Sequence, residues 1–246
     1  MARKSVVATV LALFMCAGLE AEQVAPAPPS SRDAKAQAES QSTESMLNDL
    51  LTRMDAKARE IKTLEADITV TNVENFSGRH FERTGKIRVR KPSDLFLDLE
   101  KPYPRKVWIS AAEIVDYRPD LKTGNRLKLA AGSDRPQVIG LSTTAAELKE
   151  SFDITLAPPN EKPKEYSLTL VPKAGVKVDF TSAEVMIDAA TLLPVTIVQK
   201  NKDLDETKTY AFTGTKVNSR IADSLFEPKF PKDADIQEDD GDWTGP

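Results

Sequence analysis

The chain has 246 residues, which is enough for one good-sized domain or two small ones, and its net charge is −4. Hydrophobic residues make up 40% and charged residues 29% of the sequence, as in ordinary soluble globular proteins. The basic surplus typical of nucleic-acid binders is absent. With a single histidine, His80, and a single cysteine, Cys16, most metal centres and nucleophilic triads are excluded, as is a disulfide within the chain. We therefore expect no metal site and no nucleic-acid partner.

Residues 1–21 have the pattern of a signal peptide. Arg3 and Lys4 give a positive start, and residues 6–17 form an apolar run that is too short for a membrane-spanning helix of about 20 residues. Small residues allow cleavage after residue 21 or three positions earlier. Cys16 offers lipoprotein anchoring as an alternative. That modification requires a small residue before the cysteine, and Met15 is not small. The sequence therefore predicts export from the cytoplasm.

Composition divides the rest of the chain into three parts. Residues 22–43 are rich in Ala, Pro, Ser and Gln and have too little apolar surface to offset the entropy of ordering, so we predict a disordered linker. Residues 238–246 are predicted to be an acidic tail whose role is solvation. Residues 44–237 between them are predicted to form a single folded domain.

The first element of this domain is predicted to be a helix. Ser42 or Thr43 can cap its N-terminus, and Glu44 lies in its first turn. Apolar side chains recur at steps of three and four residues and make one stripe along it. The residues of this stripe are Leu47, Leu50, Leu51, Met54, Ala58, Ile61 and Leu64.

After this helix, apolar residues alternate with polar ones, which is typical of half-buried β-strands. Short strands joined by short turns favour an antiparallel meander. Residues 135–152 interrupt the alternation and predict one or two short helices with an apolar face. The predicted strands lie around residues 68–71, 87–90, 95–99, 107–109, 166–171, 183–187, 195–198 and 209–212.

Several short motifs follow one another in a recognisable order. The opening helix runs straight into a strand at residues 61–67, and residues 85–92 contain a glycine, an alternating strand, a basic pair and a proline. A leucine-rich strand with a following proline, a Tyr-x-Pro hairpin, a Leu-x-Pro-Lys strand and a Leu-Phe closing element come next, at residues 95–102, 117–119, 168–173 and 225–232. Through these motifs the region from about Leu47 to Ile236 resembles the periplasmic outer-membrane lipoprotein carriers, the LolA-like family.

The resemblance implies an α+β fold. It implies an unclosed, strongly curved antiparallel sheet, or half-barrel, of about eleven strands, covered by the N-terminal helix and a short helical lid. It also implies a carrier that is not an enzyme and needs no cofactor. Such a carrier binds acyl chains of lipoproteins or lipids in an apolar cavity for transfer to the outer membrane. Burial of each CH₂ group contributes about 0.8 kcal/mol, so such a cavity can shield acyl chains from water. The implied partners are acylated cargo, an inner-membrane donor and an outer-membrane acceptor, and the protein is expected to be a monomer.

The same resemblance assigns roles to particular residues. Lys91, with Arg90 before it, stands where the carriers usually have an arginine that latches the lid, although lysine lacks the planar fork for that contact. The alternative for Lys91 and Arg90 is a solvated strand face, and the alternative for the apolar lid and lipid-binding residues is an ordinary packed core. The inner face of the lid is expected to carry Val138, Ile139, Leu141 and Leu148. The residues expected to bind lipid are Ile87, Val89, Leu95, Leu97, Leu99, Val107 and Ile109.

Two other functions stay open. A regulatory module of the same fold, which senses lipids or mislocalised lipoproteins and signals to a membrane partner, would use the same cavity. A carboxylate-based hydrolase is the more remote alternative, because the acidic residues lie in turns, in the tail or on strand faces and form no recognisable pair.

Overall fold

The computed structural model describes residues 31–129, 144–158, 163–176, 178–201 and 205–239. The chain divides into two compact units, residues 1–38 and residues 39–246. The second unit contains every described strand and most of the first helix, and the rest of the description concerns this unit. Among the described helices, none has the length and apolar content needed to cross a membrane.

The first helix, α1 (Ser31–Glu60), is longer than the sequence pattern predicts. It begins within residues 22–43, which we predicted as linker, because the stretch before the apolar stripe contains several Ala, Gln and Glu residues, all good helix formers. Its buried side carries the predicted stripe as far as Ala58, and Leu50 and Leu51 are each only 1% exposed. Ile61 follows the end of the helix and Leu64 belongs to the first strand, so the predicted helix was too long at this end. Lys57 and Arg59 lie in the last turn, where positive charge is favoured by the helix dipole.

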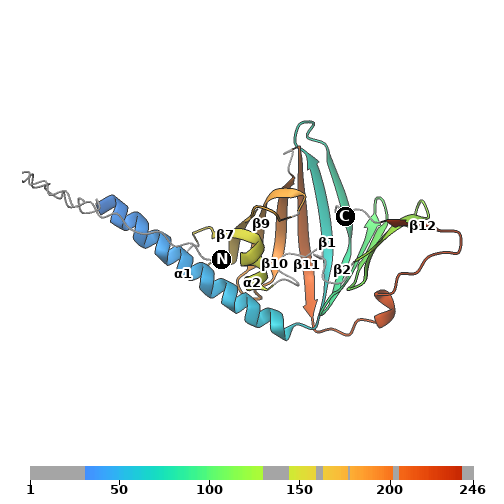
Figure 1. Cartoon of the computed structure of the whole chain (residues 1–246), viewed down its shortest axis with the longest axis horizontal. Coiled ribbons are helices and arrows are strands. Elements are labelled where there is room, and N and C mark those ends of the chain that lie inside the picture. Colours follow the sequence, from blue (N-terminus) through green and yellow to red (C-terminus); the bar gives the residue numbers. More distant parts are fainter. Residues whose placement is uncertain (1–30, 130–143, 159–162, 177, 202–204, 240–246) are drawn as a thin grey trace, which may run out of the picture. The chain divides into compact units, whose positions relative to one another are not determined.

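The strands form a single 12-stranded sheet in the order β12-β6-β5-β4-β3-β2-β1-β11-β10-β9-β8-β7, which is open at both edges (Figure 1). Every neighbouring pair is antiparallel except β12 and β6, which are parallel. The strands are β1 (Thr63–Glu74), β2 (His80–Arg90), β3 (Asp94–Lys101), β4 (Arg105–Ile109), β5 (Glu113–Arg118), β6 (Thr123–Lys128), β7 (Phe152–Leu156), β8 (Glu165–Pro172), β9 (Phe180–Asp188), β10 (Pro194–Asn201), β11 (Glu206–Val217) and β12 (Asp235–Asp239). The α+β class and the unclosed sheet predicted from the sequence are confirmed.

All the strands predicted from alternation are present, and four more are found. β5 and β6 are short, and β6 is mostly polar, so neither has a long alternating pattern. β7 begins at Phe152, which we assigned to the helical insert, because the helix before it ends at Ser151 and the chain becomes extended. β12 includes Glu238 and Asp239 of the predicted tail, and Glu238 forms an ion pair with Lys128 of β6 at 2.9 Å. These four strands depend on pairing with neighbours more than on their own pattern.

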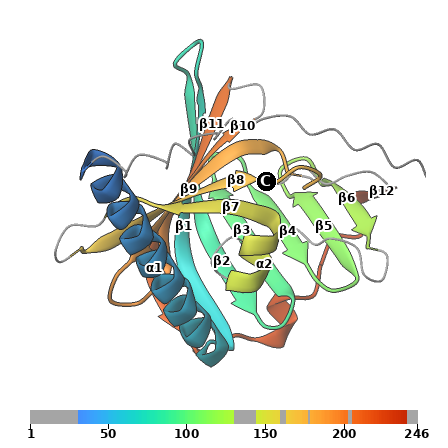
Figure 2. The same cartoon turned by 60° about the vertical axis from the view of Figure 1, so that its left-hand side comes forward.

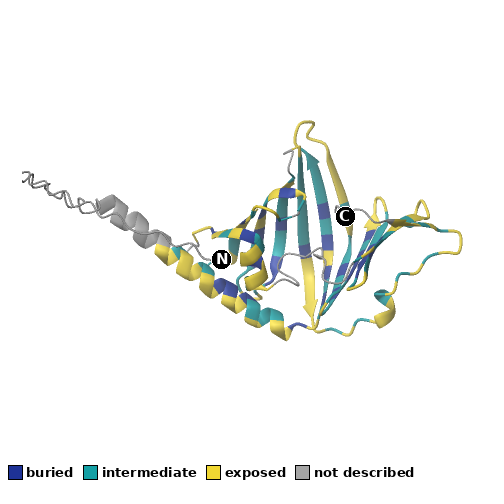
Figure 3. Ribbon diagram, viewed as in Figure 1, coloured by how far each residue is buried: buried dark blue, intermediate teal, exposed yellow. Residues whose placement is uncertain are grey.

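The two faces of the sheet have separate apolar clusters. The inner face carries the large cluster, which includes residues of α1 and of the short helix α2 (Ala145–Ser151), and α1 and α2 lie in front of the sheet in Figure 2. In Figure 3 the buried residues form bands across the strands, and exposed residues lie along α1. The outer face carries a smaller cluster of Phe96, Trp108, Val115 and Tyr117.

The outer cluster is covered by the segment that leads from β11 to β12. This segment contains a 3-10 turn, η1 (Asp223–Leu225). Its Phe230 packs edge-on against Trp108 and Tyr117 at centroid distances of 6.0 and 5.2 Å. The indole N–H of Trp108 donates a hydrogen bond to the Leu225 carbonyl at 3.0 Å. The C-terminal part of the chain therefore covers the apolar cluster of the outer face, whereas the larger apolar surface lies on the inner face.

Candidate functional site on the inner face of the sheet

Strand register arranges the inner face in rows, because residues directly opposite each other on neighbouring strands point to the same side of a sheet. The first row, nearest α1 and α2, joins Leu64, Val89, Leu95, Ile109 and Ile114. The second row joins Ala66, Ile87, Leu97 and Val107, and the third row joins Ile68, Gly85 and Leu99. Together these rows form a continuous apolar surface, which we call the apolar floor.

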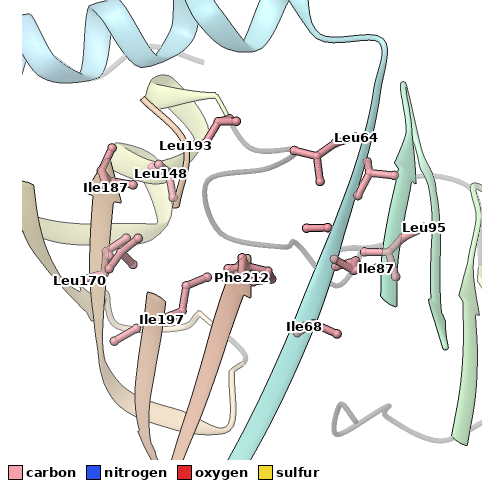
Figure 4. Close-up of a cluster of buried hydrophobic side chains, with 14 of the residues drawn as sticks. Leu64, Ile68, Ile87, Leu95, Leu148, Leu170, Ile187, Leu193, Ile197 and Phe212 are labelled. Atoms are coloured by element: carbon pink, nitrogen blue, oxygen red, sulfur yellow. The ribbon is translucent and has the colours of Figure 1, made fainter. Parts of the chain in front are cut away.

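All seven residues predicted to bind lipid lie on this floor. Their exposed fractions range from 0% for Leu99 to 8% for Leu95, and all belong to the inner cluster. Figure 4 shows how Leu64, Ile87 and Leu95 of one half of the sheet and Leu170, Ile187 and Ile197 of the other half face the same interior. The structure therefore brings the predicted residues together, and their contact with lipid stays a prediction.

Gly85 lies at a register shift within the apolar floor, where two backbones approach closely. β2 and β3 change register between Thr84 and Gly85, and a Cβ atom on Gly85 would lie only 2.0 Å from the carbonyl oxygen of Asp98. Only glycine allows the two backbones to approach this closely.

Helix α2 covers part of the floor. Leu148 is its buried residue and joins the inner cluster, as Figure 4 shows. The backbone N–H of Ala145 donates a hydrogen bond to Asp55 Oδ1 of α1 at 2.7 Å, and Lys149 Nζ donates to Asn48 Oδ1 at 2.6 Å. Thr144 and Glu147 form a capping box at the helix start. Two polar contacts and the buried side chain of Leu148 thus hold α2 in place.

A small cavity of about 20 Å³ lies between α1, α2 and the turn that joins β9 to β10. This volume is enough for about one water molecule and far too small for an acyl chain. Among the described residues that were predicted to bind lipid or to form the lid, only Leu148 borders the cavity, and Leu64 is the one floor residue beside it. The residues around the cavity are Leu51, Met54, Asp55, Ala58, Ile61, Leu64, Ala145, Leu148, Leu192 and Leu193.

The two residues predicted as the lid latch lie on opposite faces of the sheet. Lys91 Nζ donates a hydrogen bond to the Ala58 carbonyl of α1 at 2.5 Å. Burial lowers the pKa of Lys91, and the negative charge of Asp55 opposes that shift. Arg90 points to the outer face, where it pairs with Asp94 at 2.7 Å. Because neighbouring strand residues face opposite sides, the latch role stays a prediction for Lys91 alone.

Arg90 instead anchors the segment that covers the outer face. It also pairs with Asp223 at 2.5 Å, and its guanidinium carbon lies 4.4 Å from the centre of the Phe226 ring. The sequence pattern did not predict this role, because the partners lie more than a hundred positions further along the chain.

A polar border limits the apolar floor on the side away from α2. The second row continues from Val107 to Asp116, the third row from Leu99 to Arg105, and the next row places Arg83 opposite Val70. Arg105 Nε donates a hydrogen bond to Asp116 Oδ1 at 2.9 Å, and Arg105 Nη2 donates a second one to Asp116 Oδ2. Sequence reasoning missed this border, because each of these residues is an ordinary polar member of an alternating strand.

Three of the predicted lid residues, Val138, Ile139 and Leu141, lie outside the described residues. Among the residues that the structure does describe, no group of three or more His, Cys, Asp or Glu side chains could hold a metal ion.

Comparisons with known proteins bear on this geometry. The family model described as "Outer membrane lipoprotein carrier protein LolA" matches residues 59–229. The outer-membrane lipoprotein carrier protein of Coxiella burnetii (strain RSA 331) is 24% identical over 152 residues, which are 62% of this chain and 69% of that protein. The protein of the same name from Pseudomonas putida (strain W619) is 23% identical over 175 residues, 71% of this chain and 80% of its own.

A similar fold is found among solved structures. An uncharacterized conserved protein from Thermus thermophilus superposes on 79% of this chain and 99% of its own, with a TM-score of 0.51 and 15% sequence identity. This likeness concerns the fold alone.

Proposed function

The chain belongs to the family of the outer membrane lipoprotein carrier protein LolA, and from that premise we propose that it carries acylated lipoproteins or lipids across the periplasm. Members of this family are periplasmic carriers and not enzymes. In this proposal the acyl chains lie on the apolar floor, an inner-membrane protein supplies the cargo, and an outer-membrane protein accepts it. The protein acts as a monomer and is exported by the signal peptide of residues 1–21.

The observation that carries this proposal is the combination of a continuous apolar floor with a cover that is held by polar contacts. Each CH₂ group that moves from water onto the floor contributes about 0.8 kcal/mol, so a diacyl cargo has a large driving force for binding. The cavity of about 20 Å³ cannot admit such a cargo as it stands. Binding therefore requires α2 to leave its place beside α1 and uncover the floor.

The hydrogen bonds between α2 and α1 oppose this movement only weakly. When Ala145 N and Lys149 Nζ leave Asp55 and Asn48, all four groups can bond to water, so the net loss is about 1 kcal/mol for each bond. The buried contact of Leu148 is the apolar part of the cost, and acyl chains that replace it on the floor offset this cost. The polar attachment thus allows opening, and the apolar cargo drives it.

Native mass spectrometry tests the proposal directly. The purified protein is incubated with an acylated lipoprotein, or with a soluble diacylglycerol, and the masses of free and loaded protein are measured. We expect a loaded species for the wild type and its loss in Leu97→Asp, which places a charge in the middle of the floor. Val171→Asp on β8 is the matched control, because Val171 is 44% exposed. Circular dichroism shows which variants are folded.

The wild-type result decides the proposal even where Leu97→Asp does not fold. A protein that remains unloaded with every acylated probe, at concentrations that saturate other lipid carriers, would show that the floor is only a packed core. The proposal of a carrier would then be withdrawn.

A further inference from the structure

Arg83 is a partly buried cation on the inner face of the sheet. It lies opposite Val70 of β1, and Val70 is 0% exposed and lies opposite Tyr210 of β11 on its other side. All three side chains therefore share the face that carries the apolar floor. Arg83 stands where the floor ends, one row beyond Leu99 and Arg105.

Within the described part of the chain, Arg83 forms neither a hydrogen bond nor an ion pair. Two carboxylates attract it electrostatically, Asp116 and Glu206, but both have other partners. Asp116 is gripped by Arg105, and Glu206 accepts a hydrogen bond from Asn72 Nδ2 at 2.5 Å. A guanidinium has five N–H donors, so this arrangement leaves Arg83 with an unmet capacity for an anion.

The surroundings of Arg83 destabilise its positive charge as long as no anion binds to it. Burial and the neighbouring Arg105 guanidinium lower the pKa of Arg83 below its ordinary value, because both disfavour the positive charge. Burial also raises the pKa of Tyr210, so its hydroxyl stays protonated. In the next row the buried Asn72 Oδ1 has no hydrogen-bond partner among the described residues, which leaves an acceptor beside the unmet donor. Both groups would gain from a ligand that carries an anion and a hydroxyl.

We propose that Arg83, with Arg105 beside it, binds the phosphate of an anionic diacyl lipid or lipid-like cargo whose acyl chains lie along the apolar floor. The proposal rests on the function proposed above and adds a head-group site to it. Guanidinium groups bind phosphate through two parallel charge-assisted hydrogen bonds, and the geometry is fixed by the planar fork.

The length of the floor fits this arrangement. Arg83 and Val89 lie on the same face of β2, six residues apart, which corresponds to about 20 Å along a strand. That distance is comparable with an extended acyl chain. A lipid with its phosphate at Arg83 would therefore extend its chains over Ile87 and Leu97 towards the cavity beneath α2. A free phosphate ion would leave the floor unused.

The test measures binding of two soluble short-chain lipids with the same acyl chains, phosphatidylglycerol and diacylglycerol, to the purified protein by isothermal titration calorimetry. We expect the wild type to prefer phosphatidylglycerol by about tenfold or more, as one charge-assisted contact implies. In Arg83→Gln this preference should disappear, while the affinity for diacylglycerol is unchanged. Arg83→Lys should keep part of it, because it retains the charge without the fork.

Arg88→Gln is the matched control. Arg88 lies on the same strand but on the outer face, opposite Phe96, and pairs with Glu65 at 2.7 Å. The Arg88→Gln substitution removes the same charge and should leave the preference for phosphatidylglycerol intact. Thermal unfolding of each variant confirms that it is folded, and Arg83→Lys takes the place of Arg83→Gln where the latter is unstable.

The outcomes separate this inference from the carrier proposal. Binding of both lipids without any preference in the wild type, or a preference that survives in Arg83→Gln, overturns the head-group site and leaves the carrier standing. Absence of binding by either lipid removes both proposals. Inorganic phosphate that binds as tightly as phosphatidylglycerol, and through Arg83, would identify a site for the free ion and overturn the lipid assignment.

Discussion

The carboxylate of Asp55 accepts a hydrogen bond from the backbone N–H of Ala145 at 2.7 Å, and so joins α1 to the first residue of α2. The first N–H groups of any helix have no partner within the helix. In α2 the Thr144 hydroxyl accepts from the N–H of Glu147, and Asp55 accepts from that of Ala145. A helix of seven residues is not stable alone, so its docking on α1 decides whether it forms.

Replacing Asp55 by Ala should therefore loosen α2. The lost hydrogen bond leaves the partly buried Ala145 N–H without an acceptor, at a cost of about 1–3 kcal/mol. Hydrogen exchange followed by mass spectrometry should show faster exchange in the peptide that contains α2. Asp49→Ala on the same helix is the control, because Asp49 is exposed and pairs only with Arg53 in the described residues. Equal exchange of α2 in the two variants would contradict the docking role.

Lys91 should make the free energy of unfolding increase with pH in the alkaline range. Its pKa in the folded protein is lowered by burial, below the ordinary value of 10.5. Between these two values the unfolded chain binds a proton that the folded chain has released, so stability rises with pH across this alkaline window. The penalty for the buried charge is present below the folded pKa and is relieved as the pH approaches 10.5.

Lys91→Met removes this contribution, and the difference from the wild type isolates it from other groups that titrate at high pH. Urea unfolding at a series of alkaline pH values should show a flatter curve for Lys91→Met than for the wild type. Lys57→Met on the solvent side of α1 serves as the control. Parallel curves for the wild type and Lys91→Met would show that Lys91 is not a strained buried cation.

The apolar floor should be sensitive to cavities. Leu99 is 0% exposed, and Leu99→Ala should lower the free energy of unfolding by about 2–5 kcal/mol, because it removes buried methyl groups and leaves a void. Leu121→Ala, at a position that is 56% exposed, should change it by less than about 0.5 kcal/mol. Chemical denaturation measures both. A loss at Leu99 as small as at Leu121 would mean that the floor is not packed in solution.

The cover of the outer face can be followed through Trp108. Phe230→Ala removes the ring that packs against Trp108 and should cost up to about 3 kcal/mol. In a Trp243→Phe background Trp108 is the only tryptophan, so its fluorescence should shift to the red as water reaches it. Phe76→Ala, at a ring that is 90% exposed, should leave the spectrum unchanged. An unshifted spectrum in Phe230→Ala would show that the segment does not depend on Phe230 for its docking.

The inner-face residues were predictable because alternation is a local property of the chain. Ile87, Val89, Leu95, Leu97 and Leu99 alternate with polar residues, and that pattern alone places them on one face of their strands. Leu50 and Leu51 were likewise predictable from the helical period of α1. The order of helix, strands, short helix and strands was predictable in the same way, whereas the unclosed sheet followed from the resemblance that the motifs carry.

Only the tertiary structure decided which of these faces meet and where they end. The pairing of β1 with β11, far apart in the sequence, joins the two halves of the sheet. Cross-strand register brings Arg83, Arg105 and Asp116 into one polar border, although nothing near any of them in the sequence distinguishes it from a solvated strand residue. Periodicity specifies the direction of a side chain within its own strand, whereas register and covering segments depend on contacts between residues that are distant along the chain.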